Sequence, residues 1–281
     1  MIKSISYWSV AGGLEGTRPV NEALADAKQA GFAGMELCIG LEGVLTPGTS
    51  QAECEGLRSE IDKSGLVVET LASGMTWGLN PTSERPEVRR QALEATTAAL
   101  HRAAWLGCDS LLFVPGVVTS PIVPAEHVRY DRAVERATET VKRLLEVAEE
   151  VNVDLCIENV WNGLFYSPLE FKHFVESFET PRIGVYFDVG NVLGYHQHPP
   201  HWIVLLGTHI KRVHVKDFRH HFDWDGSYSF CMLGEGDVPW PETMAALRAI
   251  GYDRTLVAEM LPHRPGILET TCQAMDRILA A

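Results

Sequence analysis

Four residues that can bind a metal ion end short strand-like runs in the second half of the chain. Glu158 follows Leu-Cys-Ile, Asp188 follows Val-Tyr-Phe, His214 follows Arg-Val, and Glu259 follows Leu-Val-Ala. A carboxylate at the end of an apolar strand is held at the edge of a sheet. Three carboxylates and one imidazole suit Mn²⁺ or Mg²⁺, with Co²⁺ or Zn²⁺ as alternatives. The pattern predicts one divalent-metal site.

Each of these positions also has a purely structural explanation. A carboxylate at a strand end often caps the following helix, and a single histidine is often a core residue. Four such positions on four consecutive strands are hard to attribute to capping alone. We therefore interpret the four residues as members of a single site.

The elements that must position this site alternate between strand and helix along the whole chain. Eight βα units in about 250 residues predict one closed (β/α)₈ barrel, so the fold class is α/β and residues 1–281 form one domain. The barrel would bring the four ligands together at the C-terminal ends of strands five to eight. The expected strands are 4–10, 34–39, 66–72, 110–114, 154–158, 183–187, 211–215 and 255–259. The expected helices are 20–30, 51–64, 86–106, 130–151, 168–177, 201–207, 240–250 and 267–280.

Glycines support this division of the chain. Gly31, Gly65, Gly107 and Gly251 each end an expected helix just before a strand, where glycine can adopt the left-handed C-cap conformation. A doubly wound dinucleotide-binding sheet is the competing architecture, but no G-x-G-x-x-G motif follows the first strand. The barrel is the better interpretation.

Composition narrows the class of protein. The chain has 281 residues, of which 46% are hydrophobic, and a formal net charge of −13. That charge argues against a nucleic-acid binder. The apolar runs are too short to cross a membrane, and no signal-like region opens the chain, so a cytoplasmic location is expected. The six cysteines are widely spaced, which favours reduced core thiols over disulfides or metal ligands.

The four strand-end runs also resemble a known family. They read Ile157-Glu-Asn159, Phe187-Asp-Val-Gly-Asn191, Val213-His-Val-Lys-Asp217 and Ala258-Glu-Met260. They are similar to the xylose-isomerase-like TIM-barrel superfamily of sugar phosphate isomerases and epimerases. Within it, the nearest likeness is to the ketose 3-epimerases and the L-ribulose-5-phosphate 3-epimerase (hexulose-6-phosphate isomerase-like) group.

The resemblance implies a function. Glu158, Asp188, His214 and Glu259 would bind the divalent metal, and the two glutamates would also be the catalytic acid and base. The reaction would be epimerisation or isomerisation of a ketose or ketose phosphate, with removal of the C3 proton through a metal-stabilised cis-enediolate. The partner would be a small sugar or sugar phosphate. Family members are often dimers or tetramers, so a homo-oligomer is possible here.

Five further residues are candidates for substrate binding. Glu36 ends the second strand and is expected to contact substrate hydroxyls or to support the ligands. Trp161 would wall the sugar, and Lys216 and Arg219 would bind a phosphate or carboxylate. Asn191 stands where free-ketose 3-epimerases tend to have histidine, which favours the phosphosugar branch. The segment 222–240 is long enough to form a lid.

Three alternatives remain open at this point. A metal-dependent lyase or dehydratase, acting by β-elimination on a keto-sugar or keto-glycoside, would need the same metal and base. An endonuclease IV-like nuclease would need three metals and additional strand-end histidines, but Glu36 and Ser73 occupy two of those strand ends. A metal-free sugar-binding barrel would lack at least one of the four ligands, and all four are present.

Overall fold

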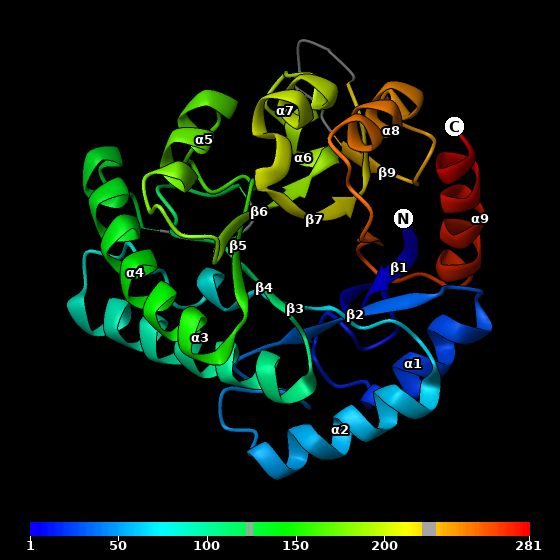
Figure 1. The fold of residues 1–281 in the computed structure, drawn as a ribbon, viewed down its shortest axis with the longest axis horizontal. Helices are drawn as coiled ribbons and strands as arrows, with labels where there is room; N and C mark the ends of the chain where they lie inside the picture. The colour runs from blue at the N-terminus through cyan, green and yellow to red at the C-terminus, as the bar shows by residue number, and fades with distance from the viewer. Residues whose placement is uncertain (122, 124–125, 221–228) are drawn as a thin grey trace.

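A closed parallel barrel forms the centre of the computed structural model, which describes residues 1–121, 123, 126–220 and 229–281. The eight strands run in the order β1-β10-β7-β6-β5-β4-β3-β2 (Figure 1). This confirms the (β/α)₈ prediction. The barrel strands are β1 (Ile2–Ser6), β2 (Gly34–Ile39), β3 (Thr70–Ser73), β4 (Ser110–Phe113), β5 (Asp154–Glu158), β6 (Ile183–Asp188), β7 (Ile210–Val215) and β10 (Thr255–Ala258).

Helices surround this barrel (Figure 1). They lie between the strands in sequence, and α9 packs against α8 and β1 to close the ring. The outer helices are α1 (Val20–Gln29), α2 (Gln51–Ser64), α3 (Pro86–Leu106), α4 (Tyr130–Val151), α5 (Pro168–Glu176), α7 (Pro199–Leu206), α8 (Trp240–Ala249) and α9 (Ile267–Ala280). A short helix, α6 (Val189–Gly194), follows β6, and the 3₁₀ turns are η1 (Tyr7–Ser9), η2 (Met75–Trp77) and η3 (Gly207–His209).

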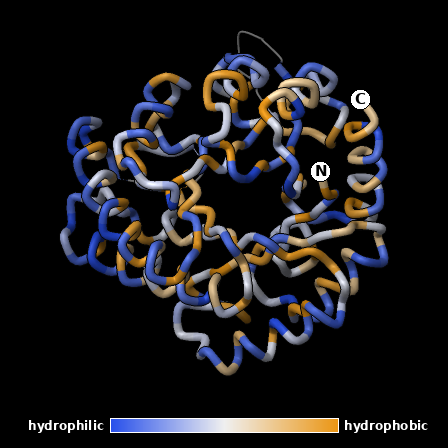
Figure 2. Tube along the Cα trace, viewed as in Figure 1, coloured by the Kyte–Doolittle hydropathy of each residue, from blue (hydrophilic) through white to orange (hydrophobic). Residues whose placement is uncertain are grey.

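Apolar and polar positions alternate along most outer helices (Figure 2), whereas α7 exposes the apolar residues Val204 and Leu205. In α4, for example, Val141, Leu144 and Ala148 are buried, whereas Glu149 and Glu150 are exposed. Burial of such apolar faces against the strands is the main force that holds the helices to the barrel. Among the described helices, none is long and apolar enough to cross a membrane.

The predicted glycine caps are confirmed. Gly65 and Gly107 follow α2 and α3 with φ angles of 72° and 79°, in the left-handed region that glycine adopts without steric cost. Each turns the chain from the end of a helix towards the next strand.

Two strands differ from their predicted bounds by more than one residue. The first strand stops at Ser6, because the Ser6 hydroxyl accepts a hydrogen bond from Trp8 N and a 3₁₀ turn begins. The third strand begins at Thr70 rather than Leu66. Val67 makes only an isolated bridge to Gly34, so the residues before Thr70 approach the barrel without joining β3.

Two segments that lie outside the predicted strands and helices contain regular structure. Helix α6 starts directly after β6, capped by the Asp188 side chain. The stretch between the predicted strand 211–215 and the predicted helix 240–250 contains an antiparallel pair, β8 (Asp217–Arg219) and β9 (Ser229–Cys231). Residues 221–228 of the predicted lid lie outside the described residues.

Alternation along β7 decides which of its side chains enter the barrel. Arg212 contacts Asp109, which precedes β4, and His214 contacts Glu36 on β2. Both partners lie three strands away around the barrel, so both side chains cross its interior. Lys216, two residues further along, follows the same inward direction at the C-terminal end.

Candidate metal and active site

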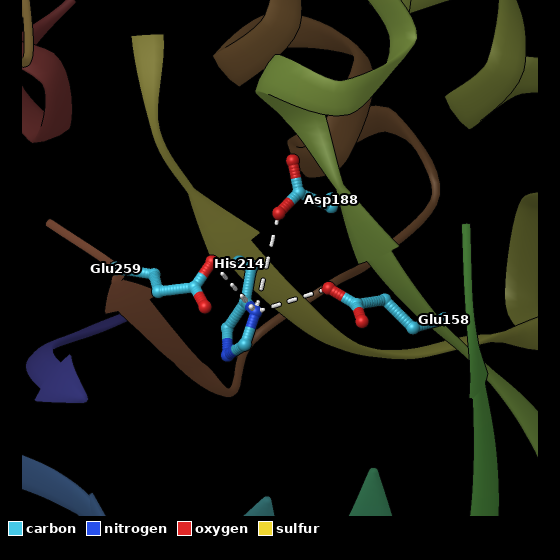
Figure 3. A group of neighbouring side chains, drawn as sticks. All are labelled: Glu158, Asp188, His214 and Glu259. Carbon is cyan, nitrogen blue, oxygen red and sulfur yellow. Dashed lines mark ion pairs between the residues drawn. The ribbon is translucent and has the colours of Figure 1, made fainter. Parts of the chain in front are cut away.

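The four predicted ligands meet at the C-terminal end of the barrel. They come from β5, β6, β7 and the residue after β10, and one ligand atom from each lies within 4.8 Å of the others. His214 Nδ1 is 3.5 Å from Glu158 Oε1, 4.0 Å from Asp188 Oδ2 and 3.8 Å from Glu259 Oε2. In Figure 3 the three carboxylates surround the imidazole, with Glu158 and Glu259 on opposite sides of it.

Three of these atoms are buried without a hydrogen-bond partner among the described residues. They are His214 Nδ1, Asp188 Oδ2 and Glu259 Oε2. Buried polar atoms are costly to leave unpaired, and such atoms facing one another indicate a missing common partner. Carboxylate oxygens with one imidazole nitrogen are a donor set for a hard or borderline divalent cation. The four residues therefore fit a metal ion.

Lys216 supplies positive charge at the same place. Its ammonium lies 2.9 Å from Asp188 Oδ2 and in short contact with Glu259 Oε2. Both contacts are ion pairs between buried carboxylates and this ammonium. The same ammonium lies 5.2 Å from the centre of the Phe230 ring. Lys216 thus balances part of the negative charge of the cluster.

Glu36 holds the imidazole of His214 from the other side. His214 Nε2 donates a hydrogen bond of 2.9 Å to Glu36 Oε1, and Glu36 Oε2 accepts from the Thr70 hydroxyl at 2.9 Å and from the Tyr186 hydroxyl. A carboxylate can only accept, so Nε2 carries its proton and Nδ1 faces the cluster. Of the two roles predicted for Glu36, this geometry supports the one of positioning a ligand.

A ladder of side-chain amides fixes Asp188. Asn159 Oδ1 accepts from Asp188 N at 2.7 Å, and Asn159 Nδ2 donates to Asp188 O at 2.8 Å. Asn191 Nδ2 in turn donates to Asn159 O at 2.8 Å. Asp188 Oδ1 caps α6 by accepting from Asn191 N, so Oδ2 is the oxygen turned to the other ligands. Asn191 lies at the cavity wall, but its amide is engaged in this ladder.

The electrostatics of the site differ between its two glutamates. Burial raises the pKa of the Glu158 carboxyl to about 7. Burial acts in the same direction on Glu259, but the positive charges of Lys216 and His214 outweigh it and lower the pKa of that carboxyl. Two carboxyl groups whose pKa values are pushed apart are suited to opposite roles in proton transfer.

A cavity of about 650 Å³ opens above the cluster and exposes Glu158 and Glu259. Trp161 and Lys216 line it, and their predicted roles in substrate binding stay predictions. Trp161 stacks on Phe230 with ring centres 4.9 Å apart, and its Nε1 donates to Asn191 O. Arg219 is placed differently: it is exposed, and its guanidinium donates to Glu235 O at 2.6 Å. Its predicted role in substrate binding stays a prediction.

Asp217 is a buried residue to which the sequence analysis gave no role. Its Oδ1 accepts from Phe218 N and Val238 N, and its Oδ2 accepts from Gly234 N and Trp240 Nε1. This one carboxylate therefore ties the β8–β9 segment to the start of α8. The only sequence signal was a charged residue directly after Lys216 at a strand end.

Comparison with known proteins extends these observations. The chain is 25% identical to the uncharacterized protein MJ1311 of Methanocaldococcus jannaschii over 186 residues, covering 64% of this chain and 60% of that protein. It is 24% identical to the D-psicose 3-epimerase of Ruminiclostridium cellulolyticum over 218 residues, covering 76% of this chain and 70% of the relative.

Solved structures share the fold at lower sequence identity. A D-psicose 3-epimerase from Clostridium cellulolyticum H10, crystallised with D-tagatose, superposes with a TM-score of 0.80 at 19% identity and covers 99% of both chains. A 3-keto-D-glucoside 4-epimerase from E. coli gives a TM-score of 0.77 at 14% identity, with both chains covered fully. An L-ribulose 3-epimerase gives 0.78 at 18% identity and covers 99% of this chain and 94% of the neighbour.

A protein-family model also matches most of the chain. It describes a xylose isomerase-like TIM barrel and matches residues 24–278, which include all four candidate ligands. Together with the closed barrel and the strand-end cluster, this match confirms the resemblance inferred from the sequence. The chain belongs to the xylose isomerase-like TIM-barrel family.

Proposed function

We propose that this protein is a divalent-metal-dependent epimerase or isomerase that moves a proton at the carbon next to a sugar carbonyl. The proposal rests on one observation: a cluster of four residues lies at the inner end of the cavity. They are Glu158, Asp188, His214 and Glu259. The ketose 3-epimerases among the relatives and structural neighbours support the same reaction class.

All four residues would hold the metal, and their donor set favours Mn²⁺ or Mg²⁺. When bound, the ion supplies positive charge beside the sugar oxygens and stabilises the negative charge that develops when a carbon-bound proton leaves. His214 is turned towards the cluster by its hydrogen bond to Glu36. Asp188 is fixed by the Asn159 and Asn191 amides.

The two glutamates would transfer the proton. They lie on opposite sides of His214, and both are open to the cavity. One carboxylate would remove the proton from one face of the reacting carbon, while the electron pair of the broken C–H bond moves towards the carbonyl to form an enediolate. The other would return a proton to the opposite face, which inverts the carbon. Return of the proton to the neighbouring carbon would instead give isomerisation.

Burial serves this chemistry in a direct way. A carboxyl with a pKa near 7 exchanges protons readily at neutral pH, and Glu158 has this property because it is buried. The lowered pKa of Glu259 keeps that group ionised at the same pH. These pKa values are those of the metal-free protein, and both carboxyl groups would be ionised when they bind the metal, so each is able to act as the base.

The test is an incubation in D₂O with Mn²⁺ and a panel of ketoses and ketose phosphates, followed by NMR. Deuterium at C3 together with a new epimer is the expected result, and deuterium at C1 or C2 would indicate isomerisation. Loss of a leaving group with a new double bond would instead identify a lyase. Glu158→Gln is the inactive variant, and Glu150→Gln makes the same chemical change on the exposed face of α4 as a control.

Metal analysis completes the test. Protein purified without chelator is expected to contain about one divalent ion per chain, with less in Glu158→Gln than in Glu150→Gln. If no protein preparation binds a divalent ion, or if both variants exchange deuterium equally, the proposed site is wrong.

A further inference from the structure

The mouth of the cavity is apolar and exposed. Leu14 is 55% exposed, Leu41 46% and Val44 39%, and all three line the cavity. Phe230 and Leu261 line it as well, with exposures of 43% and 40%. Half of the large hydrophobic side chains that are exposed in the described structure thus gather at this one opening. Such a concentration marks a binding surface.

These residues come from different parts of the chain. Leu14 follows β1, Leu41 and Val44 follow β2, Phe230 lies on β9, and Leu261 follows β10. Four separate loops or strands therefore contribute apolar side chains to one opening. The chain folds them together around the cavity, whereas solvent-exposed leucines elsewhere on the protein, such as Leu169, stand apart from it.

Aromatic rings continue the apolar lining inward. Trp161 and Phe230 stack on one wall. Trp8 and Trp77 flank Gly74, where an added Cβ would lie 3.4 Å from the first ring and 4.0 Å from the second. Aromatic walls suit the C–H faces of a sugar near the metal cluster and flat apolar groups further out.

Positive charge is scarce in the same cavity. Among its described lining residues, the cationic side chains are Lys216 and Arg264. Lys216 is held by Asp188 and Glu259, and exposed Arg264 shares the lining with the exposed Glu15 and Glu42. A phosphate ester is bound by several converging cations or N–H groups. This charge arrangement does not favour a phosphorylated substrate.

We infer that the substrate is a keto-sugar that carries an apolar aglycone, aryl or alkyl, rather than a phosphate group. The sugar would lie over the metal cluster, and the aglycone would extend between the aromatic walls to the aliphatic mouth. The cavity volume of about 650 Å³ lies within the range of about 300–1,000 Å³ that is typical for drug-sized ligands. This inference rests on the proposed function, because it places the reacting carbon at the cluster.

The experiment compares four probes with the Mn²⁺-loaded enzyme: D-fructose, D-fructose 6-phosphate, and the methyl and phenyl glycosides of 3-keto-D-glucose. Deuterium exchange next to the carbonyl is measured by NMR in D₂O. We expect kcat/KM for the phenyl glycoside to exceed that for the methyl glycoside by roughly tenfold or more, which is the usual gain from filling an apolar pocket. The phosphate ester should be the poorest of the four.

The double variant Leu14→Ser/Leu41→Ser should lower the phenyl-to-methyl ratio of kcat/KM towards one. Leu169→Ser/Leu205→Ser removes leucines of 63% and 37% exposure away from the cavity, and should leave that ratio unchanged. If the phosphate ester is the best substrate, or if the phenyl and methyl glycosides react equally well in the unaltered enzyme, the inference is wrong while the proposed function stands.

Two further results have distinct meanings. If the mouth variant changes the oligomeric state in size-exclusion chromatography and leaves the phenyl-to-methyl ratio intact, the mouth is a contact between copies and the inference is wrong. If none of the four probes exchanges deuterium in enzyme that contains metal, the proposed function fails, and the inference fails with it.

Discussion

The two ends of the barrel both contain clusters of charged side chains, but they balance the charge differently. At the N-terminal end, Arg212 pairs with Asp109, and Arg254 lies 3.2 Å from Asp109 and 3.6 Å from Glu69. Two cations thus meet two carboxylates. This equal pairing closes the floor of the barrel, the end of a (β/α)₈ barrel that generally serves stability.

At the C-terminal end the carboxylates are in excess. Glu158, Asp188 and Glu259 converge with Lys216 and His214, and Glu36 lies on the far side of the imidazole. Surplus buried negative charge is destabilising unless a further cation joins it. The comparison teaches that the charges at the N-terminal end are balanced by the chain's own side chains, whereas the C-terminal cluster keeps a surplus of carboxylates.

The largest effect should follow from changing the upper cluster. Glu158→Gln removes one proton-transferring group while keeping its size, and should lower kcat by about 10²–10⁴-fold, the usual contribution of a general acid or base. Steady-state kinetics with the best substrate of the panel measures it. A residual rate within threefold of the unaltered enzyme would remove Glu158 from the mechanism.

In the metal-free protein, the raised pKa of Glu158 should make the free energy of unfolding fall as the pH rises. Its pKa is about 7 in the folded protein and near 4.5 when unfolded, so the folded state binds the extra proton between these values. The stabilisation that this extra proton provides is therefore complete below the unfolded pKa and is lost as the pH rises through about 7. The free energy of unfolding should fall by on the order of 2–3 kcal/mol between pH 5 and 8.

Urea unfolding of EDTA-treated protein at several pH values tests this dependence. The Glu158→Gln variant has no carboxyl to titrate at this position and should show a flatter profile, with higher stability than the unaltered protein at pH 8. Mn²⁺ should restore the stability of the unaltered protein at pH 8. A profile that is identical in the two proteins would contradict the assignment of the shift to Glu158.

Glu36→Gln tests the support of the ligand histidine. The variant keeps an acceptor for His214 Nε2 but loses the charge, and should weaken metal binding by about 10–100-fold, as observed for residues that orient metal ligands. Titration calorimetry with Mn²⁺ measures it. Unchanged metal affinity would mean that Thr70 and Tyr186 hold Glu36 for structural reasons alone.

The smallest change is expected at the floor. Arg212→Met keeps the length of the side chain but removes its ion pair with half-exposed Asp109, and should lower the free energy of unfolding by about 1–2 kcal/mol. Metal affinity and kcat should not change. A large loss of activity in this variant would contradict the view that the N-terminal end of the barrel serves stability alone.

The sequence was sufficient to predict the barrel and the four ligands, because both rest on local patterns. Alternating strand and helix signals, with glycine after the helices, specify βα units, and parallel βα units place strand ends on one face. The ligands could be identified because each is a polar residue at the end of a buried strand. The structure places all four within one cluster, while their roles in metal binding and in catalysis stay predictions.

Other features depended on contacts between distant residues. The partner of Glu36 is a histidine 178 positions away, so its role as a support for His214 could not be separated from substrate binding by spacing alone. Asp217 accepts hydrogen bonds from backbone and side-chain groups of a segment up to 23 residues further on.

The inward direction of β7 has a consequence for how this chain can vary. Three inward-facing residues on β7 and directly after it have different roles. Arg212 pairs with Asp109 at the N-terminal end of the barrel, His214 belongs to the cluster, and Lys216, just after the strand, lines the cavity. Deleting Val213 would shift the strand by one residue and turn His214 and Lys216 towards the helices. Lys211 is different, because it lies at a register shift where Ile210 and Arg212 pair with the adjacent residues Val185 and Tyr186. Length changes should therefore be tolerated before Arg212, on the side of η3 and Lys211, but not between Arg212 and Lys216.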